Sequence, residues 1–270
     1  MLKAVFIDID GTLLKSDHTV SDATIKTIQQ LKEKNILVVL VSARPVHGIS
    51  RISKIVGLES APTIGLNGGY IAQNNQVLYK SNIPTSTVIA LHNAVEQYPL
   101  TTLYYQDELW FADKQSQYSI NEQKISDVPV IIQPIAETVL QWEKDNTGPN
   151  KIMMIGDEAT IQQLELTVQP QFANQLNMAK SKPIFLEAMP LNVSKAKAVE
   201  KIIQQYHIKP EEIITIGDNF NDKEMIAMAG TGIAMGNAPD AVKAVAKYVT
   251  DTNNNDGVAK AIQHFLQQWF

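Results

Sequence analysis

Two carboxylates stand two residues apart where an apolar run near the start of the chain comes to an end. The run, at residues 4–7, predicts a buried strand, and Asp8 and Asp10 follow it. Side chains alternate along a strand, so residues two apart leave it on the same side. Two carboxylates this close repel each other. Their placement makes physical sense if a cation lies between them, or if one attacks a substrate while the other handles a proton. A plain polar exit from the strand is the alternative, because Asp10 and Gly11 also form a common turn.

A second pair of carboxylates follows another apolar run, far along the chain. Residues 213–216 predict a buried strand, and the sequence GDNFND after it contains Asp218 and Asp222. If both strands belong to one sheet, three or four carboxylates converge at one edge, where their charge is costly without compensation. Mg²⁺ suits such a site, because it takes one or two protein carboxylates together with phosphate oxygens.

Two further polar residues would complete a site for phosphate. Lys195 can add a fixed positive charge, and Ser42 follows the apolar run 36–41 with a hydroxyl group. A site that combines Mg²⁺, a lysine, a hydroxyl and loop amides suits a phosphate dianion. A carboxylate beside them can act as the nucleophile and form an aspartyl-phosphate.

The elements that must position these residues alternate between strand and helix. Strands are predicted at residues 4–7, 36–41 and 63–66, and helices at residues 21–34 and 45–57. This order implies an α/β fold with a parallel sheet and right-handed crossovers. Ligands bind at the carboxyl ends of the strands in such sheets. Asp8, Asp10, Ser42 and Asn67 all fall there.

The middle of the chain has a different pattern. Residues 70–79 predict a hairpin that turns at Asn74 and Asn75, and residues 103–111 predict another. Residues 84–187 are less apolar and richer in Gln, Thr and Tyr, and they are numerous enough for a small α+β domain. They contain no obvious catalytic cluster, which favours a lid or a structural appendage, although a lid can still choose the substrate. The α/β pattern returns from Ser194, with a helix predicted at residues 240–246 among others.

The composition excludes several classes of function. The chain has 270 residues, a net charge of −5, no long basic run and no cysteine. Nucleic acid is therefore not an expected partner, and the lack of cysteine fits a reducing cytoplasm. The longest apolar run, residues 36–41, is too short to cross a membrane, and the sequence shows no charged and apolar leader.

Four segments resemble, in order and spacing, the four motifs of the haloacid dehalogenase superfamily. They are residues 8–14 (DIDGTLL), residues 42–44 (SAR), Lys195 and residues 217–222 (GDNFND). The insert between the second and third motifs resembles the type IIB cap of the Cof-type sugar phosphatases. The resemblance implies a Rossmann-like α/β core made of residues 1–83 and 188–270, with residues 84–187 as an inserted α/β cap. It also implies a cytoplasmic, Mg²⁺-dependent phosphatase for small phosphorylated metabolites, sugar phosphates first. We expect a monomer or a weak homodimer that binds neither nucleic acid nor membrane.

The resemblance also assigns roles to the acidic residues. Asp8 would be the nucleophile and a Mg²⁺ ligand. Asp10 would protonate the leaving oxygen, then activate water, and reach the metal through its backbone carbonyl. Asp218 would ligate Mg²⁺, with Asp222 behind it.

The remaining roles concern the phosphate. Ser42 and the amide of Ala43 would hold phosphoryl oxygens, Asn221 would contact the phosphate, and Lys195 would neutralise charge on the nucleophile and the phosphate. Ala196 stands where the family usually has glycine, and Lys197 is a nearby rival for the role of Lys195. Arg44 is a candidate for substrate binding, or equally for a salt bridge at the start of a helix.

Three other interpretations use the same residues. A phosphomutase would move the phosphoryl group between hydroxyls, which requires that the intermediate be protected from water. A phospho-acceptor switch would keep a long-lived aspartyl-phosphate, but such domains are about half this length and lack a second acid two residues after the acceptor. A sugar-phosphate-binding regulator would not need the acid and base group of Asp10.

Overall fold

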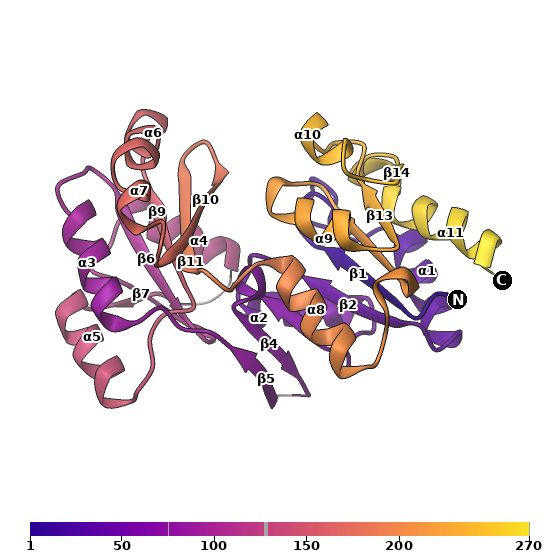
Figure 1. Cartoon of the computed structure of the whole chain (residues 1–270), viewed down its shortest axis with the longest axis horizontal. Helices are drawn as coiled ribbons and strands as arrows, with labels where there is room; N and C mark the ends of the chain where they lie inside the picture. The colour runs from indigo at the N-terminus through magenta and orange to yellow at the C-terminus, as the bar shows by residue number, and fades with distance from the viewer. Residues whose placement is uncertain (75, 127–128, 270) are drawn as a thin grey trace. The chain divides into compact units, whose positions relative to one another are not determined.

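The computed structural model describes residues 1–74, 76–126 and 129–269 (Figure 1). By their contacts the residues form two compact units. The first contains Met1–Ala43, Ile49–Leu78 and Ser194–Phe270, and the second contains Arg44–Gly48 and Tyr79–Val193. The described helices include none long and apolar enough to cross a membrane.

A sheet of eight strands forms the centre of the first unit, in the order β14-β13-β12-β1-β2-β3-β4-β5. Its strands are β1 (Ala4–Asp8), β2 (Leu37–Val41), β3 (Thr63–Gly65), β4 (Tyr70–Gln73), β5 (Gln76–Lys80), β12 (Ile213–Gly217), β13 (Thr231–Ala234) and β14 (Tyr248–Val249). The strands from β14 to β3 are parallel, whereas β4 runs antiparallel to β3. The carboxyl ends of the parallel strands therefore meet at one edge.

Helices cover both faces of this sheet. They are α1 (Asp22–Glu33), α2 (Val46–Ile55), α8 (Lys195–Gln205), α9 (Lys223–Met228), α10 (Asp240–Lys243) and α11 (Gly257–Trp269), with short 3₁₀ turns η1 (Leu66–Gly68), η2 (Pro210–Glu212), η3 (Phe220–Asp222) and η4 (Asn253–Asn255). Apolar residues of α1, α2 and α11 pack in one cluster with alternate residues of β1, β2 and β12. On the other face, Thr215 of β12 donates a hydrogen bond to the carbonyl of Met225 in α9. The central strands are buried on both sides, which explains why they are almost entirely apolar.

The second unit has a sheet of its own, of six strands in the order β10-β11-β9-β6-β7-β8. The strands are β6 (Thr101–Gln106), β7 (Leu109–Ala112), β8 (Ile131–Ile132), β9 (Lys151–Ile155), β10 (Leu176–Lys182) and β11 (Phe185–Pro190). The helices are α3 (Thr85–Val95), α4 (Gln117–Ser126), α5 (Ile135–Lys144), α6 (Glu158–Thr167) and α7 (Gln169–Phe172). All its pairings are antiparallel except β7 with β8. Helices α3, α5, α6 and α7 share an apolar cluster with one face of the sheet.

The predicted α/β class is confirmed, and three details of the prediction need correction. The strand predicted at residues 63–66 ends at Gly65, because Leu66 has a left-handed backbone (φ 52°) that no strand accommodates. The helix predicted at residues 240–246 ends at Lys243. The strands β10 and β11 were not predicted at all. Of the turn predicted at Asn74 and Asn75, Asn75 lies outside the described residues.

Candidate active site

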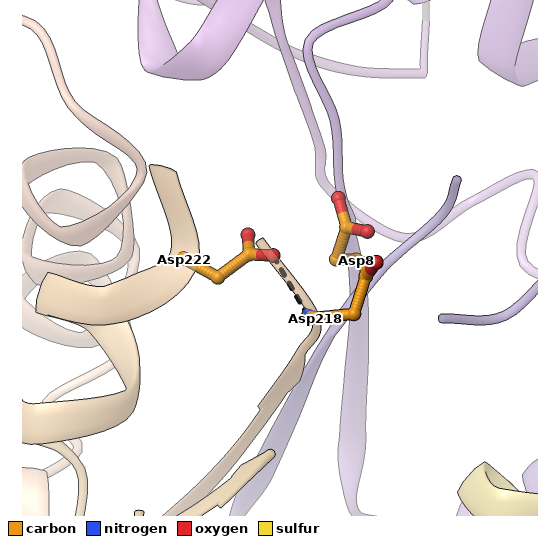
Figure 2. Close-up of side chains that lie close together, drawn as sticks. All are labelled: Asp8, Asp218 and Asp222. Atoms are coloured by element: carbon orange, nitrogen blue, oxygen red, sulfur yellow. Dashed lines mark hydrogen bonds between the residues drawn. The ribbon is translucent and has the colours of Figure 1, made fainter. Parts of the chain in front are cut away.

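Three carboxylates meet where β1 and β12 end side by side. One oxygen each from Asp8, Asp218 and Asp222 lies within 4.8 Å of the others (Figure 2). The register explains this meeting, because Ile7 pairs with Ile216 and so brings the two strand ends level. Burial, followed by the charge of Asp222, raises the pKa of Asp8 well above its usual range. The same two causes raise the pKa of Asp218 to about 6.

Lys195 lies inside this acidic cluster. Its Nζ is 2.5 Å from Oδ1 of Asp8 and 2.5 Å from Oδ1 of Asp222, and its side chain is 1% exposed. Burial alone would lower the pKa of Lys195, but the charges of Asp222 and Asp8 outweigh it and hold the pKa above its usual value. Lys195 is therefore a cation, whereas its rival Lys197 has an exposed side chain.

Lys195 is held in place by the start of α8, of which it is the first residue. Ser194 is the N-cap of this helix, and its Oγ accepts a hydrogen bond from the amide of Lys197. The cap fixes where the helix begins, because it satisfies a backbone donor that has no partner within the helix. The ammonium group is thus delivered by a rigid element, although the lysine side chain itself is flexible.

Asp222 braces the loop that carries Asp218. Its Oδ2 accepts hydrogen bonds from the backbone amides of Asp218 and Asn219, both at 3.0 Å, and the first of these bonds is the dashed line in Figure 2. Its Oδ1 contacts Lys195. Asp222 is fully buried and bonds two backbone amides and an ammonium group, which fits a positioning residue better than a metal ligand.

The turn after β1 is shaped around Asp218. Thr12 donates a hydrogen bond from Oγ1 to Oδ1 of Asp218 at 2.9 Å, and Asn237 donates from Nδ2 to Oδ2 at 3.3 Å. Gly11 has φ +85°, and a Cβ there would collide with the Asp218 carboxylate. Asn237 also donates to the carbonyl of Gly11 at 2.9 Å. No role was predicted for Asn237, although its place shortly after β13 puts it at the edge of the sheet where ligands bind.

Ser42 comes directly after β2 and is buried. Its amide donates to the carbonyl of Ile64, and its own carbonyl accepts from the amide of Asn67, both at 2.9 Å. Because Asp8 pairs with Val41, Ser42 lies next in register to Asp8, and Ala43 follows it. Asn221 donates from Nδ2 to Oδ1 of Asn67 at 2.9 Å. The ends of β1, β2, β3 and β12 thus bring polar groups to one edge.

Two further residues were predicted for the site, Asp10 and Arg44. Asp10 is exposed, two residues beyond the end of β1, and its carboxylate is not among the three that converge. Its backbone forms an isolated bridge with Leu14, so it belongs to the turn that also contains Thr12. Arg44 groups by its contacts with the second unit, whereas the carboxylate cluster belongs to the first.

The donor set of the cluster fits a hard metal cation. Three carboxylates face one ammonium group, and the pKa values of Asp8 and Asp218 are raised because like charges are buried together. A divalent cation would reverse this penalty, and carboxylate oxygens are the ligands that hard cations prefer. Asp8 and Asp218 are the residues that would hold it, since Asp222 already serves Lys195 and the loop amides.

Comparison with known proteins agrees with this fold. A family model described as haloacid dehalogenase-like hydrolase matches residues 5–262. A putative phosphatase of Haemophilus influenzae is 32% identical over 266 residues, which cover 97% of this chain and 98% of that protein. The Bacillus subtilis 5-amino-6-(5-phospho-D-ribitylamino)uracil phosphatase YcsE is 30% identical over 271 residues, which cover 98% of this chain and 96% of that protein. The structure of the HAD subclass IIB sugar phosphatase BT4131 matches with a TM-score of 0.83 and 26% identity, over 97% of this chain and 98% of that one.

A buried acidic cluster at the carboxyl ends of a parallel sheet defines a hydrolase site of the haloacid dehalogenase type. The chain belongs to the haloacid dehalogenase-like hydrolases, and within them to the Cof-type subclass IIB phosphatases.

Proposed function

We propose that this phosphatase hydrolyses small sugar and polyol phosphates with Mg²⁺, through a phosphoryl group carried by Asp8. One observation supports this most strongly. Asp8 is buried at the end of a central strand, in direct contact with the cationic Lys195, and its register partner Val41 directly precedes Ser42. Few other reactions need a fixed ammonium group, a hydroxyl and a buried carboxylate nucleophile at one place.

In the first step, an oxygen of Asp8 attacks phosphorus and the bond to the leaving oxygen breaks. Asp10, which is exposed beyond the strand, gives its proton to that oxygen. Lys195 and the hydroxyl of Ser42 stabilise negative charge on the phosphoryl group, together with the amide of Ala43 and the side chain of Asn221. Bound Mg²⁺ would add a Lewis acid that offsets the same charge.

In the second step, water attacks phosphorus of the aspartyl-phosphate. Asp10 is now the base and takes a proton from this water, so Asp8 is released and inorganic phosphate leaves. Lys195 keeps its hydrogen bond to Asp222 throughout, because both groups are buried and fixed by α8 and η3. The same residues therefore serve both steps without rearrangement of the backbone.

The substrate class rests on two relatives. BT4131 is described as a sugar phosphatase, and YcsE is named for a substrate with a phosphorylated ribityl chain. Both substrates are phosphate esters on a chain of hydroxyl-bearing carbons. We therefore place polyol and sugar phosphates first among the substrates, and propose that the second unit, predicted as a cap at residues 84–187, selects among them. Arg44 stays a candidate for substrate binding, while the cytoplasmic location and the monomeric or weakly dimeric state remain predictions from the sequence.

The test is release of inorganic phosphate from a panel of sugar phosphates, polyol phosphates and nucleotides, with Mg²⁺ and with EDTA. Wild type, Asp8→Asn and Asp240→Asn are compared, the last because Asp240 is an exposed aspartate at the start of α10 in the same unit. We expect Mg²⁺-dependent release by wild type and Asp240→Asn, and none by Asp8→Asn.

Two outcomes would contradict the proposal. Equal release of phosphate with Mg²⁺ and with EDTA would show that the reaction does not require the metal. Absence of release from every substrate, with acid-labile phosphate retained on wild type after treatment with acetyl phosphate, would indicate a phospho-acceptor switch.

A further inference from the structure

The turn after β3 has an unusual backbone for residues that are not glycine. Leu66 and Asn67 have φ values of 52° and 55°, and Gly68 has φ +99°. Asparagine tolerates this left-handed region, but a branched residue such as leucine is rarely found there. Leu66 and Asn67 are also buried, at 0% and 3% exposed. A strained and buried turn persists only when the surrounding structure requires it, and this strain is often found at functional sites.

This turn holds Ser42 through the backbone. The carbonyl of Ser42 accepts a hydrogen bond from the amide of Asn67, while the amide of Ser42 donates to the carbonyl of Ile64. Ser42 is thus fixed on both sides by β3 and the turn that follows. The left-handed conformation directs the amide of Asn67 back toward β2, which an extended continuation of β3 would not do.

The same turn approaches the helix that carries Lys195. A Cβ on Gly68 would collide with the carbonyl of Ser194, the N-cap of α8. Only glycine fits this close approach. The turn and α8 are therefore packed backbone to backbone at the residue that precedes Lys195.

The side chain of Asn67 holds Asn221. Its Oδ1 accepts a hydrogen bond from Nδ2 of Asn221 at 2.9 Å, across 154 residues of sequence. Among the described residues, Oδ1 of Asn221 is buried without a hydrogen-bond partner. The orientation of the Asn221 amide is therefore determined on its nitrogen side, by Asn67. A reversed amide would bring two oxygen acceptors face to face.

We infer that Asn67 is a positioning residue for the phosphate site, which fixes the amide of Asn221 so that its nitrogen serves the substrate. This inference rests on the proposed function. Phosphate offers only acceptors, so Asn221 is useful only when it presents a donor. Nδ2 carries two hydrogens: Asn67 takes one, and the other is available to a phosphoryl oxygen.

The experiment is a double-mutant cycle that measures kcat and KM for p-nitrophenyl phosphate, with inorganic phosphate as a competitive inhibitor. The variants are Asn67→Gly, Asn221→Ala and the two combined. Glycine keeps the left-handed backbone and removes only the side chain. Asn35→Gly is the matched control, because Asn35 is an exposed left-handed asparagine (φ 58°) just before β2, at its opposite end from Ser42.

We expect Asn67→Gly and Asn221→Ala each to lower kcat/KM by about tenfold, the effect of one hydrogen bond to a charged group. The double variant should stay within about threefold of Asn221→Ala, because Asn67 acts through Asn221. The inhibition constant of inorganic phosphate should rise in the same pattern, while Asn35→Gly matches wild type.

A second variant at position 67, Asn67→Asp, tests the inference even if Asn67→Gly does not fold. Asn67→Asp keeps an oxygen acceptor at the same place, so removal of Asn221 should cost about tenfold there as in wild type, and little in the Asn67→Gly background. A fully multiplicative loss in the double variant would overturn the inference, as would wild-type kinetics for Asn67→Gly. An inactive wild type would instead refute the proposed function, so the two failures are distinguishable.

Discussion

Each unit contains a buried lysine paired with a carboxylate, and the two groups differ in geometry. Lys195 in the first unit is 2.5 Å from both Asp8 and Asp222. Lys151 in the second unit is 3.6 Å from Glu187, and its Nζ lies 4.7 Å from the centre of the Tyr105 ring. The first lysine is shared by two acids, whereas the second is shared by an acid and an aromatic face.

The two groups also differ in how their charge is balanced. Glu187 accepts a hydrogen bond from Ser181 at 2.9 Å. Burial raises the pKa of the nearby Glu122, and the charges of Lys151 and Lys182 partly offset this rise. Cations and acids alternate there. Around Lys195, by contrast, three carboxylates compete for one cation, and the pKa of Asp8 is raised by burial and by Asp222. Both groups contain a buried ion pair, so burial alone does not distinguish them. The difference is the excess negative charge around Lys195, which marks the candidate active site, whereas the pair of Lys151 and Glu187 is structural.

The largest predicted effect distinguishes the carboxylate of Asp8 in the first unit from that of Glu187 in the second. Asp8→Asn removes the nucleophile and should lower kcat by about 10⁴-fold or more. Because the pKa of Asp8 is raised in the folded protein, its charge opposes folding, so the variant should not lower Tm in EDTA. Glu187→Gln should do the reverse, with kcat for p-nitrophenyl phosphate within about threefold of wild type and a lower Tm. Turnover assays and thermal melts measure kcat and Tm of both variants. A lower Tm for Asp8→Asn than for wild type would contradict the expected difference between the two carboxylates.

The next largest effect is the loss of stability when either buried lysine, Lys195 or Lys151, is replaced. Lys195→Met leaves three carboxylates together and should cost about 3–5 kcal/mol of unfolding free energy in EDTA. Lys151→Met should cost less, about 1–3 kcal/mol, because its partner is farther away and also bonds Ser181. Denaturant titrations of both variants measure this difference. Equal costs would mean that the geometry of the two pairs does not matter.

A smaller effect should come from the metal. Mg²⁺ at about 100 times its Kd should stabilise wild type by about 2.7 kcal/mol, because only the folded protein binds it. Asp218→Asn should lose most of this response, whereas Lys151→Met should keep it. Asp10→Asn should also keep it, with most turnover gone. Thermal melts with and without Mg²⁺ provide the measurement, and a full response in Asp218→Asn would remove this residue from the metal site.

The smallest effect should appear at an exposed carboxylate of the second unit. Asp157 is the N-cap of α6, and hydrogen bonds from Thr160 lower its pKa. Its charged form therefore stabilises the fold above its ordinary pKa, and this contribution disappears as the pH falls through the lowered value. Asp157→Asn should lower Tm slightly at pH 7 and not at pH 2. An equal difference at both pH values would show that the charge does not contribute.

Much of the first unit could be predicted because its central strands are short, mostly apolar and followed by polar residues. Asp8 and Asp218 follow such strands, and parallel pairing brings the strand ends together. The left-handed Leu66 could not be predicted, because leucine gives no signal for it and packing imposes it. The bond between Asn67 and Asn221 joins loops far apart in sequence, so no local pattern indicates it.

The second unit was harder to predict because its strands carry mixed side chains. The sequence of β10, LNMAKSK, has two lysines, and neither it nor β11 has the apolar run that made β1 visible. β10 pairs with β11, and β11 pairs with β9, so both strands depend on a tertiary sheet that overrides weak local preference. The helix α4 likewise has no apolar stripe, so its periodicity gave no signal.

The pairing of β1 with β12 has a consequence for synthesis of the protein. The contact of Thr12 with Asp218 spans 206 residues, and the segment between them includes the whole second unit. At about 5–20 residues per second, the ribosome needs roughly 10–40 seconds to add the partner of β1. During that interval the nascent chain displays an apolar strand with an open edge. The contiguous stretch Tyr79–Val193 emerges earlier and can fold first, so the acidic centre assembles only after the second unit has been synthesised.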